Sequence, residues 1–122
     1  MLSGIFQEGY SRLRQQLTQL SDSIEAGSID SKELTGKVSG LQQWFAQNIL
    51  PLPFADLDAA DFALARSYNT ELHKQLRLLA TDAMFFGSAR QAATVKKRTQ
   101  QLRDRLETLV RYCDVLLDNP PK

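Results

Sequence analysis

The chain has 122 residues, of which 43% are hydrophobic and 24% charged, and its 15 lysines and arginines against 14 acids give a formal net charge of +1. This length suffices for one hydrophobic core, so we expect a single helical domain over residues 1–122. No apolar run approaches the roughly 18 residues of a membrane span, and the N-terminal stretch lacks the basic and apolar regions of a secretory signal. Cys113 is the only cysteine, which excludes an intramolecular disulfide and fits a reducing compartment. We therefore expect a cytoplasmic protein without a membrane span.

The first half of the chain predicts two amphipathic helices. Apolar residues recur at spacings of four and three from residue 6 to residue 24, as in a helix packed nearly parallel to its neighbours. Gly27 marks the end of this helix, because glycine accepts the left-handed conformation that closes helices. Asp30 and Glu33 form a capping-box pattern at the start of the second helix, and Pro51 and Pro53 end it. The two apolar seams are Phe6, Tyr10, Leu13, Leu17, Leu20 and Ile24, then Leu34, Val38, Leu41, Phe45 and Ile49.

Two further helices follow the proline-containing linker. Asp58 and Asp61 predict the third helix start, since carboxylates stabilise the free amides there. Only Gly87 and Ser88 interrupt the pattern before the fourth helix, so we expect the break at these residues, with a long continuous hairpin arm as the alternative. The seams are Ala65, Tyr68 or Asn69, Leu72, Leu76, Leu79, Ala83 and Phe86, then Val95, Thr99, Leu102, Leu106, Leu109, Cys113 and Leu116.

Four seams joined by short loops predict an all-α, up-down-up-down four-helix bundle. We expect ten of the seam leucines and Phe45 to be buried together, and residues 119–122 to form a frayed tail. The residues predicted to share this core are Leu13, Leu17, Leu20, Leu41, Phe45, Leu72, Leu76, Leu79, Leu102, Leu106 and Leu109.

Residues that could support catalysis are scarce. His73 is the only histidine, so a His-Cys or multi-His metal site cannot form within one chain. His73 lies off its seam, which indicates a surface or boundary position rather than a general base. Cys113 occupies a seam position, which is typical of an inert buried thiol. Glycine-rich phosphate loops and hydrolase motifs are absent from the sequence. We predict a protein that is not an enzyme and that has no cofactor and no metal site.

The third helix has more apolar residues than one core face requires. At 100° per residue, Leu78 and Phe85 fall on one flank of its seam, and Met84 projects far around the other. Two interpretations stay open: the extra residues form a second packed surface, or the loop that carries Phe54 folds over them.

Charge is segregated along the chain. Residues 73–111 contain nine bases and three acids, for a net charge of +6, whereas residues 1–72 carry five bases and nine acids, for −4. A basic region of this kind can steer an acidic protein, nucleic acid or lipid surface. The alternative is a solvated helix face balanced by the acidic first two helices.

The stretch ELHKQLRLLATDAMFFGSARQAATVKKR, together with LVRYCDVLL near the C-terminus, resembles the PatD family, the heterocyst frequency control proteins of cyanobacteria. The resemblance is densest over residues 68–117. It implies a small non-enzymatic regulator that limits how many vegetative cells become heterocysts. It also implies a link to cell division through the tubulin-like protein FtsZ.

These observations converge on one hypothesis, a docking site for an acidic protein, with FtsZ as the candidate that the resemblance implies. Apolar burial would supply affinity, and bases would steer the partner and set its register. The alternatives are a homodimer formed through the same apolar residues and a nucleic-acid-binding regulator. The sequence argues against the nucleic-acid alternative, because the bases are not interleaved with aromatic residues for base stacking. The predicted partner-binding residues are Leu78, Met84, Phe85, Arg90, Lys96, Lys97 and Arg98.

Overall fold

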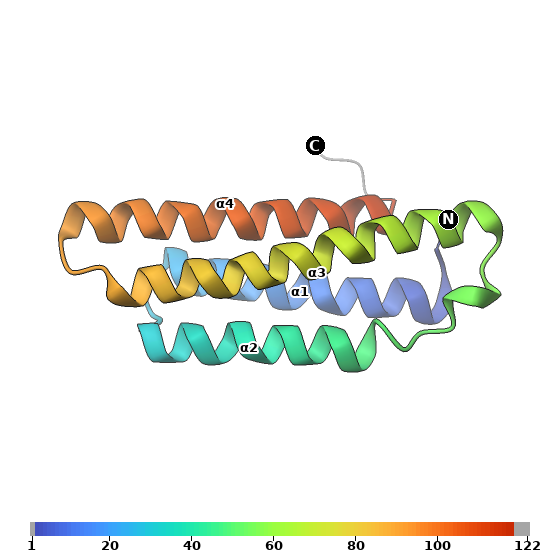
Figure 1. Cartoon of the computed structure of the whole chain (residues 1–122), viewed down its shortest axis with the longest axis horizontal. Coiled ribbons are helices and arrows are strands. Elements are labelled where there is room, and N and C mark those ends of the chain that lie inside the picture. Colours follow the sequence, from blue (N-terminus) through green and yellow to red (C-terminus); the bar gives the residue numbers. More distant parts are fainter. Residues whose placement is uncertain (1, 119–122) are drawn as a thin grey trace.

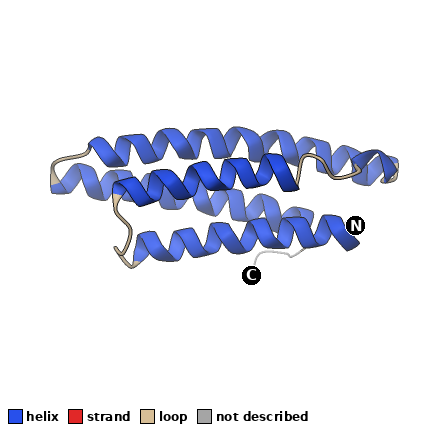
Figure 2. Ribbon diagram, turned by 90° about the horizontal axis from the view of Figure 1, so that it is seen from below, coloured by secondary structure: helices blue, strands red, loops and turns tan. Residues whose placement is uncertain are grey.

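Four α-helices make up most of residues 2–118, the part of the chain that the computed structural model describes (Figure 1). They are α1 (Gly4–Glu25), α2 (Ser31–Asn48), α3 (Ala59–Ser88) and α4 (Ala92–Leu116), with a short 3-10 helix, η1 (Phe54–Asp56), between α2 and α3. Figure 2 shows only helices and loops in this part of the chain. The tail predicted at residues 119–122 lies outside the described residues.

Successive helices run in opposite directions and pack side by side, and α4 returns to pack against α1 (Figures 1 and 2). This closed ring of neighbours is the up-down-up-down four-helix bundle that the seam pattern predicted. Contact between α1 and α2 is the least extensive of the four, so α3 and α4 hold much of the bundle together.

The helix ends follow the predicted capping chemistry. The carboxylate of Asp30 accepts a hydrogen bond from the backbone N–H of Glu33 at 2.8 Å, and the carboxylate of Asp58 accepts one from the N–H of Asp61 at 2.8 Å. Each bond satisfies an amide that the first helical turn leaves without a backbone partner. Gly27 follows the end of α1 with a φ of +67°, a left-handed conformation that glycine adopts without strain. The sequence predicted all three boundaries.

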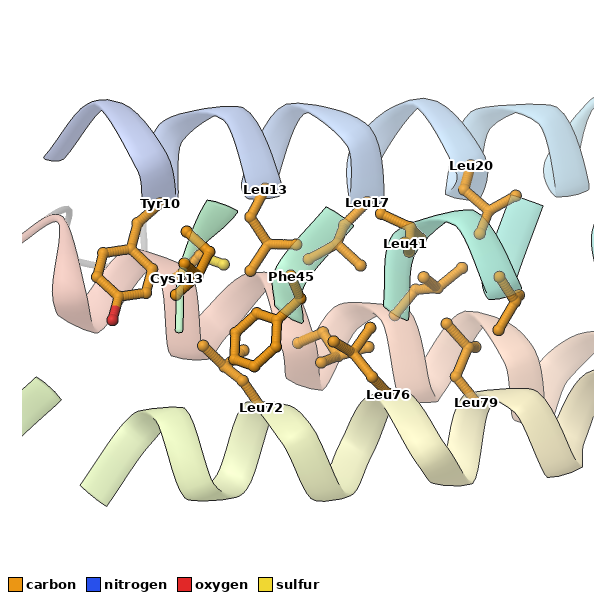
Figure 3. Close-up of a cluster of buried hydrophobic side chains, with 14 of the residues drawn as sticks. Tyr10, Leu13, Leu17, Leu20, Leu41, Phe45, Leu72, Leu76, Leu79 and Cys113 are labelled. Atoms are coloured by element: carbon orange, nitrogen blue, oxygen red, sulfur yellow. The ribbon is translucent and has the colours of Figure 1, made fainter. Parts of the chain in front are cut away.

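The inward faces of the four helices form one apolar core (Figure 3). Every leucine predicted to share this core is buried, as is Phe45. Tyr10 is also completely buried, and its hydroxyl donates a hydrogen bond to the side-chain oxygen of Asn69 in α3. Burial raises the pKa of the Tyr10 phenol well above its usual range, so the group stays neutral inside the bundle.

The junction between α3 and α4 differs from the prediction. The helix continues through Gly87 and Ser88, and the chain turns at residues 89–91, where Ala89 adopts an extended conformation. Gly87 lies beside Ser31 at the start of α2, so a side-chain carbon at position 87 would collide with the Ser31 hydroxyl. Glycine at this position therefore permits the close approach of two helices and does not end α3.

The α3–α4 hairpin is the longer pair of helices, at 30 and 25 residues against 22 and 18 for α1 and α2. Its turn reaches past the loop that joins α1 to α2 (Figures 1 and 2). The end of α3, the turn and the start of α4 therefore form the tip of the molecule.

Candidate functional site

The C-terminal half of α3 presents a continuous outward surface, which we call the distal α3 face. Its members fall within an arc of about 120° when the helix is projected at 100° per residue. All of them are exposed except Leu78, which is half-buried. Two exposed side chains of this face are apolar, Met84 with 69% of its surface exposed and Phe85 with 46%. The distal α3 face consists of Lys74, Arg77, Leu78, Thr81, Met84, Phe85 and Ser88.

Arg98 of α4 covers part of the Phe85 ring. Its guanidinium carbon lies 4.8 Å from the ring centroid, and its Nη1 donates a hydrogen bond to Oε1 of Gln101 at 2.9 Å. A guanidinium stacked over an aromatic face is attracted by the negative charge density of the ring. The contact therefore holds an aromatic side chain in place while nearly half of its surface stays open to solvent.

A polar cluster next to this contact joins α3 to α4. Asp82 is buried, and its Oδ2 accepts a hydrogen bond from Nε of Arg105 at 2.9 Å, while Nη1 of Arg105 donates to Oε1 of Gln75 at 2.9 Å. Farther along the same interface, the rings of Tyr68 and Tyr112 meet edge to face at 5.5 Å. Because Arg105 must reach both Asp82 and Gln75, the cluster sets the position, or register, of α4 along α3.

This register places Arg98 opposite Phe85. Arg98 and Arg105 are seven residues apart, or two helical turns, and therefore lie on the same side of α4. Sequence reasoning missed the cluster, because it treated Asp82 only as one acid among many bases. Gln75 and Asp82 repeat the seven-residue spacing on α3, and this matched spacing on two adjacent helices is the signal that could have predicted it.

The region around the distal α3 face is cationic. Between residues 73 and 98 the only acid is Asp82, which Arg105 already engages. None of the six bases in this segment forms an ion pair within residues 2–118. These bases, which are Lys74, Arg77, Arg90, Lys96, Lys97 and Arg98, are therefore available to an external carboxylate.

The structure brings only some of the predicted partner-binding residues together. Leu78 and Phe85 share the edge of the distal α3 face that borders α4, where Arg98 meets Phe85. Met84 lies on the opposite edge of the same face. Arg90 stands in the exposed turn between the helices.

The two lysines before Arg98 point in other directions than Arg98 does, because consecutive helical side chains are about 100° apart. Lys97 lies on the outer side of α4 and borders the distal α3 face. Lys96 is two turns before Arg103, which pairs with Glu25 of α1, so Lys96 lies on the α1 side of α4.

The linker does not cover the distal α3 face. Phe54 instead packs against Phe6 of α1, with ring centroids 5.3 Å apart. Figure 1 shows this linker at the end of the bundle opposite the α3–α4 turn. Of the two interpretations left open by the sequence, the one in which Phe54 shields Leu78 and Phe85 is wrong.

The single histidine and the single cysteine have the positions predicted for them. His73 is exposed and borders a shallow surface groove of about 480 Å³ beside Leu50 and Phe62. Cys113 is fully buried, and burial raises the pKa of its thiol to about 12, so the nucleophilic thiolate is scarce at neutral pH.

The described residues contain neither a metal-binding cluster nor a membrane-spanning helix. Within residues 2–118, no cluster of three or more histidine, cysteine or carboxylate side chains has a geometry suited to a metal ion. In the same residues, no helix combines the length and the apolar character needed to cross a bilayer.

The fold and its surface define a small helical bundle with an exposed aromatic and basic face. No family model, curated protein or solved structure matches this chain. The resemblance to the PatD family therefore stays a prediction.

Proposed function

We propose that this protein is a small, non-enzymatic cytoplasmic regulator that binds another protein through the distal α3 face. The observation that carries the proposal is Phe85, which is 46% exposed beneath Arg98 in a segment whose bases form no ion pair with any residue from 2 to 118. Aromatic and arginine side chains dominate the energetics of protein interfaces, and an aromatic ring buries a large area with little loss of conformational freedom. An immobilised Phe85 ring has already lost part of that freedom before a partner arrives.

The partner is expected to be acidic. Six bases that have no carboxylate partner among the described residues create a positive potential, which accelerates the approach of a negatively charged surface and disfavours a basic one. The resemblance to the PatD family favours FtsZ as this partner and the control of heterocyst frequency as the process. FtsZ-type proteins are generally acidic and carry extended tails, which suits a cationic docking surface.

Self-association through this face is the weaker alternative. A two-fold symmetric dimer brings the same patch of each subunit together. The cationic segment would then meet its own copy, and like charges would oppose the apolar contact of Met84 and Phe85. A dimer would therefore have to form through another surface of the bundle.

The test is quantitative capture of partners from a native lysate, followed by binding kinetics with the purified partner. Phe85→Ala should weaken the complex by about 1–3 kcal/mol, mainly through faster dissociation, while the far-ultraviolet circular dichroism stays unchanged. Val115→Ala is the matched control. Val115 is also 46% exposed, but it lies at the C-terminal end of α4, whereas Arg98, which meets Phe85, lies near the N-terminal end. It should leave binding intact.

Charge reversal provides a second, separable readout. The combined Lys96→Glu and Lys97→Glu change should slow association and reduce its salt dependence. Lys97→Glu should have the larger effect of the two single changes, because Lys97 borders the distal α3 face. The proposal fails if Phe85→Ala binds as well as the unaltered protein, or if both charge reversals leave every association rate unchanged.

A further inference from the structure

We infer that the segment recognised by the distal α3 face is an acidic amphipathic α-helix that lies along the seam between α3 and α4. This inference rests on the proposed function and specifies the kind of partner. Three features support it: the spacing of Leu78 and Phe85, the positions of the bases around them and the length of the surface.

The spacing of Leu78 and Phe85 matches a helical ligand. The two residues are seven apart in α3, so they point the same way with about 10.5 Å between their positions along the axis. A bound helix repeats its apolar residues at the same interval, with the first and the eighth on one face. An extended strand presents same-face side chains about 6.8 or 13.6 Å apart, and neither interval reaches both residues.

The bases lie on both sides of this apolar pair. Arg77 stands on the outer flank of the distal α3 face, whereas Arg98 and Lys97 stand on the α4 side. Lys74 continues the line one turn beyond Leu78. The complementary ligand has a narrow apolar stripe with carboxylates on both flanks, which an amphipathic helix provides. A strand offers a single row of side chains on each face.

The extent of the surface sets the length of the bound segment. From Lys74 to Ser88 the distal α3 face spans about 21 Å, which corresponds to roughly 14 residues or four turns of a helical ligand. Arg90, in the turn beyond Ser88, stands at one end of this path. A carboxylate at the matching terminus of the ligand would fix the direction of binding.

The experiment compares two fluorescein-labelled peptides of identical composition, each of 15 residues with leucines at positions 1, 4, 8 and 11 and glutamates flanking them. One peptide is cross-linked into a helix, and the other carries D-residues at two central positions that prevent helix formation. Binding to the full-length protein is measured by fluorescence anisotropy at low and moderate salt. Amide shifts in ¹⁵N-labelled protein locate the contact.

The helical peptide should bind at least about tenfold more tightly than its disordered counterpart and lose affinity as salt is added. Amide shifts should centre on Leu78, Phe85 and Arg98. Phe85→Ala should weaken binding by about tenfold or more, whereas Val115→Ala should change it less than about twofold.

The remaining outcomes separate this inference from the proposed function. Equal binding of both peptides, with the same loss in Phe85→Ala, would overturn the helical ligand and leave an acidic docking surface. Absence of binding by either peptide would overturn the inference, while the capture experiment with Phe85→Ala would still decide the proposed function. Tighter binding of duplex DNA than of either peptide, with the same dependence on Phe85, would overturn both.

Discussion

Along the edge of α4 that faces α1, opposite charges meet near the surface. Arg103 approaches Glu25 at 2.5 Å, and Arg14 of α1 approaches Asp114 at 2.6 Å. Both arginine side chains are 41% exposed, so water screens these pairs and each contributes little to stability. Their charges are also satisfied within the molecule.

Along the edge that faces α3, the same helix uses arginine differently. Arg105 engages the buried carboxylate of Asp82, and Arg98 lies over the ring of Phe85 without a carboxylate partner in the described chain. On the α1 side both arginines are paired with acids, whereas on the α3 side only Arg105 is paired and Arg98 leaves a cationic, aromatic surface. The difference lies in the group opposite each arginine, which is a carboxylate for Arg105 and an aromatic ring for Arg98.

The largest expected effect concerns the interior that the two edges enclose. Burial raises the pKa of the Cys113 thiol from 9.0 to about 12, so its thiolate fraction at pH 8 falls roughly a thousandfold. A thiol-specific reagent should therefore label the native protein at least about a thousandfold more slowly than the denatured protein, as followed by absorbance. Rapid native labelling would mean that one edge opens readily and exposes the core.

A core truncation should weaken both edges at once. Leu106 is fully buried in α4 between them, so Leu106→Ala removes packing against both neighbouring helices and should cost about 2–5 kcal/mol. Urea unfolding monitored by circular dichroism measures the loss. Val115→Ala, on an exposed position of the same helix, is the control. A loss below about 0.5 kcal/mol for Leu106→Ala would contradict the assigned inward face.

Neutralising one acid on each edge tests whether the two edges contribute differently to stability. Asp82→Asn removes a charged acceptor from a buried hydrogen bond and should cost about 1–3 kcal/mol. Glu25→Gln disrupts an exposed pair and should cost less than about 1 kcal/mol. Equal losses in urea unfolding would mean that the two edges do not differ in the way described.

Much of the fold could be predicted because its signals are local. Asp30, Gly27 and Asp58 act on amides or backbone angles a few residues away, so their roles follow from neighbouring sequence alone. Gly87 was misassigned for the opposite reason. Its role depends on Ser31, which is 56 residues away along the chain and adjacent only in the folded bundle.

The candidate site was predicted in outline and corrected in detail. The sequence identified Leu78, Phe85 and Arg98 as candidates, but it could not distinguish Arg98 from Lys96 as the base that meets the aromatic ring. That distinction depends on the rotation of α4 against α3, which no single helix specifies. The burial of Asp82 depends on the same rotation, and it was missed.

The sequence by itself determined the four helices, except for the end of α3, and which side of each helix faces inward, because the 3.6-residue period of apolar side chains is a property of the local chain. The tertiary structure alone decided the register of α3 against α4, the partner of each arginine and the exposure of Phe85. Those features arise from contacts between segments far apart in sequence, such as Asp82 with Arg105 and Gly87 with Ser31. Their energies exist only once the helices have packed.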